Sequence, residues 1–384
     1  MFKGAALASL FFMATHFGWT QDGPGQQPPA NNQQTSPPSA TIFSTTAVRW
    51  DNIDFSALFD GYYSFNNNHP DSNLNGLYNF NDRTDRVDLN LLRLTLNRDP
   101  DPIGFHVDIG FGRAMQIMHT PVPDPAGFRF LEQAYVSVKP RSWKGLEIDL
   151  GDFATSAGAE VIETKDNWNY SRSLLFALAT PYYHFGLRAS MPIGGSFNAG
   201  VQVIDGWNTI VDQHGNNMRT VGLTSAVTRK KFTWNNNYYV GPQWTAATRG
   251  NRNLYDTTLL LTPADRFSAY VNFDYGQQHA LLNSLNRWYG VAVAAHFQAT
   301  KRIAFSPRAE YYNDPSGFTT GTRQQLHEVT LTGEYKMLDG LLGRLEYRRD
   351  DSNVPYFDRG AAYGVSKSQS TVTVGLIAFF PIKH

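Results

Sequence analysis

Residues 267–275 read FSAYVNFDY, and most of the chain follows the pattern of this stretch. Apolar or aromatic residues occupy every second position from Phe267 to Tyr275, while Ser268, Asn272 and Asp274 fill positions between them. Successive side chains of a β-strand point to opposite faces, so a period of two predicts a strand with one apolar and one polar face.

The same alternation recurs along the chain. It covers residues 55–63, 105–111, 146–150, 183–191, 289–297, 303–311 and 372–380. Strands of roughly ten residues are long enough to cross a bilayer when tilted. The alternation slips over residues 86–96 and is weak over 232–240. No segment of the mature chain is apolar for long enough to predict a transmembrane helix.

The connections between these strands are short and long in turn. Short ones with turn residues fall at 98–102, 140–145, 192–195 and 337–340; long polar ones fall at 66–84, 116–127, 155–180, 207–217 and 350–368. Short turns at one end and long loops at the other are typical of an outer-membrane barrel. The sequence therefore predicts an all-β fold, a closed antiparallel transmembrane β-barrel of about 16 strands with short periplasmic turns and long extracellular loops.

A soluble β-sandwich or β-propeller is the alternative fold. A propeller needs a repeated motif, and we find none. Aromatic residues make up 14% of the chain, and Tyr pairs stand at strand ends, beginning at Tyr62, Tyr182, Tyr238 and Tyr311. Aromatic girdles at both membrane interfaces account for such pairs, so the pattern favours the membrane barrel.

The N-terminal residues predict export. Lys3 precedes an apolar run over residues 4–14 that is too short to span a bilayer, which is typical of a secretory signal peptide. An ordinary buried helix is the alternative. We assign residues 1–21 to the signal peptide, 22–50 to a disordered linker rich in Pro, Gln and Asn, and 51–384 to a barrel in the bacterial cell outer membrane.

Composition excludes several classes of function. Lys and Arg number 33 and Asp and Glu number 33, so we expect no nucleic-acid partner. The absence of Cys excludes disulfides, thiolate metal sites and Cys nucleophiles. The ten His are scattered, and no hydrolase elbow, zinc-protease or phosphate-loop motif occurs. We expect no catalytic residue, no metal site and no cofactor.

Residues 155–180 form the one long segment that does not alternate. A structureless insertion of this length is usually functional. We expect it to fold into the lumen as a constriction, with candidate residues Glu160, Glu163, Asp166, Trp168, Tyr170 and Arg172. Trp168 and Tyr170 would offer stacking surfaces to a sugar-like solute. The alternative is an extracellular loop packed over the mouth or against a neighbouring subunit.

Charged residues lie on the polar face of several predicted strands. Such a density of charge is unfavourable in a dry core but tolerable beside water. We therefore predict that they line a pore: Asp108, Glu147, Asp149, Arg188, Arg308, Glu310, Glu334, Arg344, Glu346 and Arg348. Opposed rows of Arg and carboxylate would create a transverse field. The alternative is that these residues form structural cross-strand ion pairs.

Four stretches carry a family resemblance. AEVIE at 159–163, NWNYSRS at 167–173, PYYHFGLR at 181–188 and GRLEYR at 343–348 together resemble the OmpL-like β-barrel porins of bacterial outer membranes. The resemblance extends from about residue 55 to the C-terminus and implies an outer-membrane location and pore formation, without a substrate. The aromatic residue that barrel-assembly machinery reads is displaced here, because four residues follow Phe380.

The expected function is that of an outer-membrane porin. Small hydrophilic solutes or ions would diffuse passively through a water-filled lumen narrowed by an inward loop, and no reaction would be catalysed. The expected partners are outer-membrane lipid, small hydrophilic solutes and the barrel-assembly machinery. A homotrimer is left open. The alternatives are an outer-membrane hydrolase and a plugged barrel that serves as an adhesin or receptor.

Overall fold

The computed structural model describes residues 48–50, 52–120, 127–210, 219–243, 248–280 and 284–381. The predicted signal peptide, residues 1–21, and residues 22–47 of the predicted linker lie outside the described residues. The last three residues of that linker form β1, Val48–Trp50, which pairs with the start of the first long strand. Residues 121–126, 211–218, 244–247 and 281–283 also lie outside the described part.

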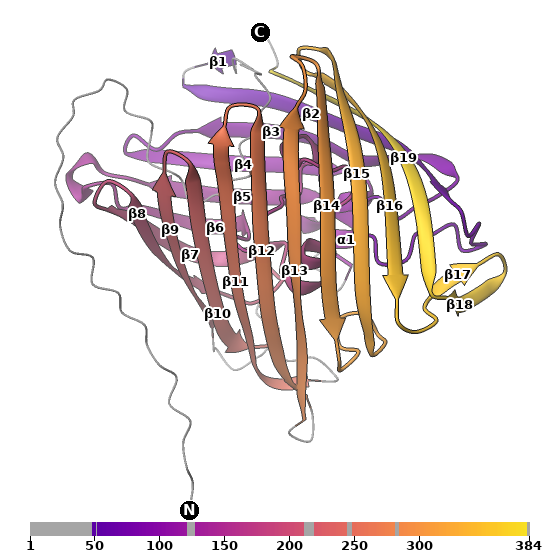
Figure 1. The fold of residues 1–384 in the computed structure, drawn as a ribbon. Coiled ribbons are helices and arrows are strands. Elements are labelled where there is room, and N and C mark those ends of the chain that lie inside the picture. Colours follow the sequence, from indigo (N-terminus) through magenta and orange to yellow (C-terminus); the bar gives the residue numbers. More distant parts are fainter. Residues whose placement is uncertain are drawn as a thin grey trace, which may run out of the picture.

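Sixteen long strands form one closed antiparallel barrel in the described part of the chain (Figure 1). They are β2 Ile53–Asn66, β3 Arg86–Arg98, β4 Ile103–Phe111, β5 Leu131–Val138, β6 Glu147–Ala154, β7 Tyr183–Ile193, β8 Phe197–Ile204, β9 Thr220–Arg229, β10 Phe232–Pro242, β11 Thr248–Ala264, β12 Phe267–Ala280, β13 Leu285–Gln298, β14 Ile303–Asp314, β15 Gln324–Leu338, β16 Leu341–Ser352 and β19 Ser368–Pro381. Each pairs with its neighbours in sequence, and β19 pairs with β2 to close the ring. The predicted barrel and its strand number are confirmed.

The two faces of each strand differ as the alternation predicts. On β16, Leu345 and Tyr347 point outward with 58% and 41% of their surface exposed, whereas Arg344 and Glu346 between them are 3% and 1% exposed. Closure of the ring satisfies the backbone of every barrel strand without a free edge, which is what a lipid environment requires. The apolar outer band therefore faces lipid and the polar face points inward.

A β-bulge explains why the alternation slips over residues 86–96. Between β2 and β3, Asp60 pairs with Leu91 and the next residue, Gly61, pairs with Leu89. Asn90 is therefore an extra residue on β3, and it shifts the order of the inward and outward positions. Its side chain points into the barrel and donates to Asp60 Oδ2 at 2.6 Å.

Connections at the two ends of the barrel differ in length. At one end the strands are joined by short turns such as residues 194–196, 230–231 and 339–340. The other end carries the long loops over residues 67–85 and 155–182, which join β2 to β3 and β6 to β7. It also carries helix α1, Arg113–Met118, and the hairpin of β17, Phe357–Arg359, with β18, Ala362–Ser366.

Among the described residues, no helix has both the length and the apolar character that a membrane span requires.

The assignment of the outer face to lipid predicts the effect of a charge there. Leu345→Arg places a cation at an outward position in the middle of β16, and we expect it to lower the free energy of unfolding in lipid by about 2–4 kcal/mol. Reversible unfolding of the protein in lipid vesicles measures this change. Tyr363→Arg on β18 is the control, because Tyr363 is 72% exposed but lies outside the barrel. Equal effects of the two substitutions would contradict the lipid-facing assignment.

Candidate functional site

The loop between β6 and β7, residues 155–182, lies inside the barrel, and we call it the lumen loop. Most of its side chains are buried, and several of the partly exposed ones fall between residues 161 and 166. It contains a 3-10 turn at Thr164–Asp166 and a π-helical turn at Leu175–Ala179. Elsewhere in this loop many backbone groups form hydrogen bonds to side chains of the loop itself or of the barrel, because they have no strand partner.

Arginine side chains of the barrel supply donors to the carbonyl groups of the lumen loop. Arg344 on β16 donates to the backbone carbonyls of Thr164 at 2.7 Å and Asn167 at 2.6 Å. It also donates to the carbonyl of Asn169 at 3.0 Å and pairs with Glu334 at 2.7 Å. One guanidinium thus satisfies three loop carbonyls, because its N–H groups form a fixed fork.

Glutamate side chains of the barrel accept from the amide groups of the same loop. Glu346 on β16 accepts from the backbone N–H of Tyr170 at 2.6 Å and of Ser171 at 2.9 Å. Glu310 on β14 accepts from the backbone N–H of Leu174 at 2.9 Å. Charge-assisted bonds of this kind are stronger than neutral ones, so these two strands hold the loop firmly.

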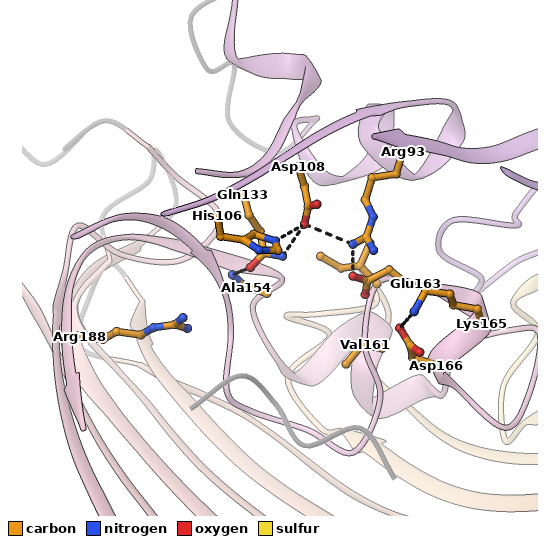
Figure 2. Close-up of a pocket in the computed structure, with 11 residues that line it drawn as sticks. Arg93, His106, Asp108, Gln133, Ala154, Val161, Glu163, Lys165, Asp166 and Arg188 are labelled. Atoms are coloured by element: carbon orange, nitrogen blue, oxygen red, sulfur yellow. Dashed lines mark hydrogen bonds and ion pairs between the residues drawn. The ribbon is translucent and has the colours of Figure 1, made fainter. Parts of the chain in front are cut away.

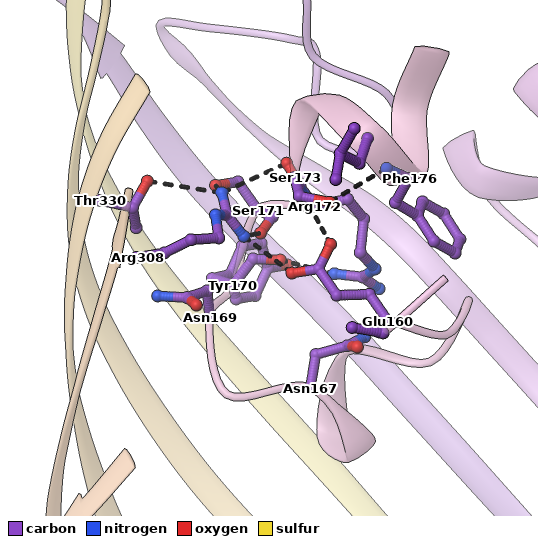
Figure 3. Close-up of polar contacts among 12 residues, drawn as sticks. Glu160, Asn167, Asn169, Tyr170, Ser171, Arg172, Ser173, Phe176, Arg308 and Thr330 are labelled. Carbon is purple, nitrogen blue, oxygen red and sulfur yellow. Dashed lines mark hydrogen bonds and ion pairs between the residues drawn. The ribbon is translucent and has the colours of Figure 1, made fainter. Parts of the chain in front are cut away.

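A buried ion pair joins the lumen loop to the middle of β14 (Figure 3). Arg308 donates through Nη1 to Glu160 Oε1 and to the carbonyl of Ser171, both at 2.8 Å. Glu160 accepts from the backbone N–H of Ser173 at 2.6 Å through its other oxygen. Arg308 also lies 3.3 Å from Glu328 on β15. The pair is therefore surrounded by hydrogen bonds, which a buried ion pair requires.

Arg172 holds the lumen loop in its own shape. Its guanidinium donates to the backbone carbonyls of Val161 at 2.8 Å and Tyr170 at 2.6 Å, and to Thr164 Oγ1 at 3.0 Å. The carbonyl of Arg172 in turn accepts from Arg348 on β16 at 2.7 Å. Arg172 thereby ties two stretches of the loop to each other.

The aromatic residues of the lumen loop are packed away from any solute. Trp168 is 4% exposed and stacks against Tyr270 and His296, with ring centroids 5.2 and 5.6 Å away. Tyr170 is 1% exposed, and its hydroxyl donates to Asp60 Oδ1 at 2.5 Å. The expectation that Trp168 and Tyr170 offer stacking surfaces to a solute is therefore wrong, because protein groups already cover both rings.

A second loop, residues 67–85, packs on the lumen loop, and we call it the cover loop. Phe80 is fully buried against Phe176 and Tyr182, with centroid distances of 5.8 and 5.4 Å. The Arg348 guanidinium lies 4.2 Å from the ring centroid of Tyr78. The sequence indicated only a long polar loop here, and its inward course was missed.

A cavity of about 240 Å³ remains between the lumen loop and strands β3–β7 (Figure 2). Residues of the loop border it on one side and inward residues of the strands border it on the other. It is lined by Arg93, His106, Asp108, Gln133, Ala154, Val161, Ile162, Glu163, Lys165, Asp166 and Arg188. Four partly exposed residues of the lumen loop thus face this space: Val161, Glu163, Lys165 and Asp166.

Arg93 on β3 links the loop to this side of the barrel. Its Nη1 lies 3.3 Å from Asp108 and 3.4 Å from Glu132, and it also contacts Glu163 of the lumen loop. These three carboxylates lie close enough together to share one cation. The guanidinium of Arg93 supplies that positive charge, so the cluster is an ion-pair network at the edge of the cavity.

Two further polar pairs complete the strand side of the cavity. His106 Nε2 lies 2.8 Å from Asp108 Oδ2, and Gln133 donates to the same oxygen at 3.0 Å. Arg188 on β7 donates through Nε to Asp149 on β6 at 2.7 Å. The side chains that face the space are thus held in position by their neighbours.

The residues predicted to line a pore separate into three groups. Asp108 and Arg188 border the cavity, and Glu147 and Asp149 lie on β6 among its neighbours. The other six lie on β14–β16 and contact the lumen loop or one another: Arg308, Glu310, Glu334, Arg344, Glu346 and Arg348. Pore lining therefore stays a prediction for Asp108 and Arg188. The contacts of the six residues on β14–β16 instead indicate that these residues anchor the loop.

The loop residues also separate. Glu163 and Asp166 border the cavity, whereas Glu160, Trp168, Tyr170 and Arg172 are buried within the loop contacts.

Sequence reasoning missed Arg93, His106 and Lys165 as cavity residues. His106 falls between two apolar residues of the alternation over residues 105–111, and that was the available signal. Arg93 lies where the bulge interrupts the alternation, so the pattern did not predict whether its side chain points inward or outward.

The anchoring contacts predict a change in loop accessibility. Arg344→Ala removes the donor of three loop carbonyls and leaves Glu334 without its buried partner, a loss worth about 3–5 kcal/mol in comparable buried pairs. We expect trypsin to cleave the folded variant after Lys165 or Arg172, whereas the wild-type loop resists. Mass spectrometry of the fragments identifies the cut.

Arg349→Ala is the matched control for this experiment. Arg349 lies on the same strand, but its side chain is 48% exposed and pairs with the exposed Asp351. We expect this variant to resist trypsin like the wild type. An uncut lumen loop in the folded Arg344→Ala protein would show that the anchor is dispensable.

Comparisons with solved structures show the same fold in outer-membrane proteins. The outer membrane channel DcaP of Acinetobacter baumannii matches with a TM-score of 0.60 at 9% identity, over 85% of this chain and 97% of that chain. The anion-selective porin from Comamonas acidovorans matches with a TM-score of 0.57 at 12% identity, over 85% of this chain and 99% of that chain. The trimer form of OmpT, an outer membrane protein of Vibrio cholerae, matches with a TM-score of 0.56 at 10% identity, over 85% of this chain and 99% of that chain.

Comparison with curated protein sequences gives no match. A family model does match, and it is described as putative beta-barrel porin-2, OmpL-like. The match covers residues 52–380, which include all but the end of the barrel. The resemblance inferred from the sequence is therefore confirmed. The chain belongs to the OmpL-like beta-barrel porin-2 family, and it is a porin of the bacterial outer membrane.

Proposed function

We propose that small hydrophilic solutes or ions diffuse passively through the cavity between the lumen loop and strands β3–β7, and that the chain catalyses no reaction. The observation that carries this proposal is the one-sided anchoring of the loop. Its backbone is bonded to β14 and β16 by five charged side chains, and the cavity lies on the other side.

The asymmetry has a simple physical basis. Arg308, Glu310, Arg344 and Glu346 bind backbone groups of the lumen loop, so the loop lies against that side of the barrel. On the opposite side four side chains of the loop are partly exposed: Val161, Glu163, Lys165 and Asp166. Loop and strands there make fewer direct bonds, which supports a constriction in this position.

The chemistry of the cavity suits a hydrated solute. Both signs of charge border it, with Glu163, Lys165 and Asp166 on the loop and Asp108 and Arg188 on the strands. Polar solutes can replace water at these groups, whereas an apolar solute would remove water from them without compensation. The facing charges also support the transverse field expected from the sequence.

A plugged barrel is the second candidate, and the burial of both loops favours it. The cover loop and the lumen loop fill much of the interior with buried side chains such as Phe80, Tyr170 and Phe176. Such a barrel would act as a receptor or adhesin through its loops and would carry no current.

Two further proposals accompany this function. One of the similar solved structures is a trimer form, and we propose a homotrimer for this chain as well. Residues 1–21, which lie outside the described residues, would direct export, and the linker would follow up to the barrel.

Single-channel conductance in a planar bilayer tests the pore and its position together. We expect stable open steps from the purified, folded protein. Val161→Trp adds a large ring at the border of the cavity, so we expect a smaller conductance because the solute path narrows. Closures in groups of three would support the homotrimer.

Val374→Trp on β19 is the control, because Val374 is 55% exposed on the outer face of the barrel. We expect it to leave the conductance unchanged. Silence from a protein shown to be folded by circular dichroism would favour the plugged barrel. Equal conductance of the two Trp variants would place the pore elsewhere.

A further inference from the structure

Buried charge in this barrel is strongly one-sided, although the whole chain is balanced. Lys plus Arg equal Asp plus Glu in the sequence. Among the described residues, however, fifteen Asp and Glu side chains are buried against six Arg and no Lys. Most of the compensating cations therefore lie on exposed surfaces, where water screens them. The lumen carries an excess of carboxylate.

The excess continues behind the cavity, on strands β5 and β6. Three carboxylates there each pair with a cation through one oxygen, and the second oxygen is buried without a hydrogen-bond partner. The pairs are Glu132–Arg93 at 3.4 Å, Glu147–Lys139 at 2.9 Å and Asp149–Arg188 at 2.7 Å. The unpartnered atoms are Glu132 Oε2, Glu147 Oε1 and Asp149 Oδ1.

Unpartnered hydrogen-bond donors are fewer than unpartnered carboxylate oxygens on this side of the barrel. Among the charged groups named for this side of the barrel, Arg188 Nη2 is the one buried nitrogen that lacks a partner in the described structure. Buried polar atoms are normally satisfied by protein or by bound species, so three open carboxylate oxygens call for donors or cations. Water and small cations supply these, whereas an anion does not.

The residues that border the cavity do not offset this excess of negative charge. Arg93, Lys165 and Arg188 face it, and so do the three carboxylates Asp108, Glu163 and Asp166. Lys165 is bound to Asp166 at 2.5 Å, and Arg93 is shared among three carboxylates. The direct lining is thus balanced, and the carboxylates behind it determine the field.

We propose that this pore is selective for cations, and that its solutes are small metal cations or molecules with an ammonium group. The proposal rests on the pore proposed above and adds the class of solute. Low-dielectric walls around a water-filled constriction focus the field of the carboxylates, which raises the local concentration of cations and lowers that of anions.

The reversal potential in a potassium chloride gradient across a planar bilayer tests this selectivity. We expect a ratio of potassium to chloride permeability well above one. Asp166→Asn on the loop and Glu132→Gln on β5 should each lower the ratio by roughly fourfold, because one unit charge at roughly 10 Å in water changes the cation and anion concentrations by about twofold each and in opposite directions. Asp166 is partly exposed, so its variant folds even where the buried Glu132 variant does not.

Asp351→Asn is the matched control, because Asp351 also pairs with a nearby cation but is 43% exposed on the outward side of β16. We expect it to leave the ratio unchanged. A wild-type pore that prefers chloride would overturn the selectivity and leave the pore intact. Unchanged ratios in both cavity variants would overturn the assignment to this side of the barrel. An absence of current would instead contradict the proposed function.

Discussion

Hydrogen bonding of the lumen-loop backbone is the constraint on which the interior of this barrel depends. A segment that enters a barrel without regular structure brings backbone N–H and C=O groups that must find partners. Here the partners are charged side chains, with Arg344 as donor and Glu346 as acceptor to neighbouring stretches of the loop. Arg172 satisfies carbonyls within the loop itself. Charge on the inner face thus takes the place of secondary structure.

This arrangement determines where open space remains. The strongest bonds come from β14 and β16, so the loop lies against these strands and the cavity opens toward β3–β7. Arg93 then ties Glu163 to the far side, which limits how far the loop can move across the lumen. The inner face therefore has two roles. One half anchors the loop, and the other half presents charge to the cavity.

Much of the fold was predictable, because alternation reports directly on which face of a strand meets lipid. The contact partners of the inward residues were not predictable. A period of two tells which side of the strand a residue lies on, but not which strands it faces across the barrel. Arg308 and Arg344 were thus placed inward but assigned to water, when they bind a loop distant in sequence. Arg93 was missed because the extra residue Asn90 interrupts the pattern. Trp168 looked available because nothing in the neighbouring sequence shows that Tyr270 and His296 pack against it.

The measurement that tests this account most directly is cysteine accessibility, since the chain has no native Cys to interfere. Single Cys residues would be placed at the cavity positions Gln133 and Val161. Two more would be placed at anchoring positions, Asn169 of the lumen loop and Thr332 of β15, because the Asn169 side chain donates to Thr332 Oγ1 at 2.8 Å. A charged thiol reagent is then added during single-channel recording. The account predicts current block from the two cavity positions and none from the two anchoring positions. Block from the anchoring positions alone would contradict it, because the solute path would then run where the loop is bound.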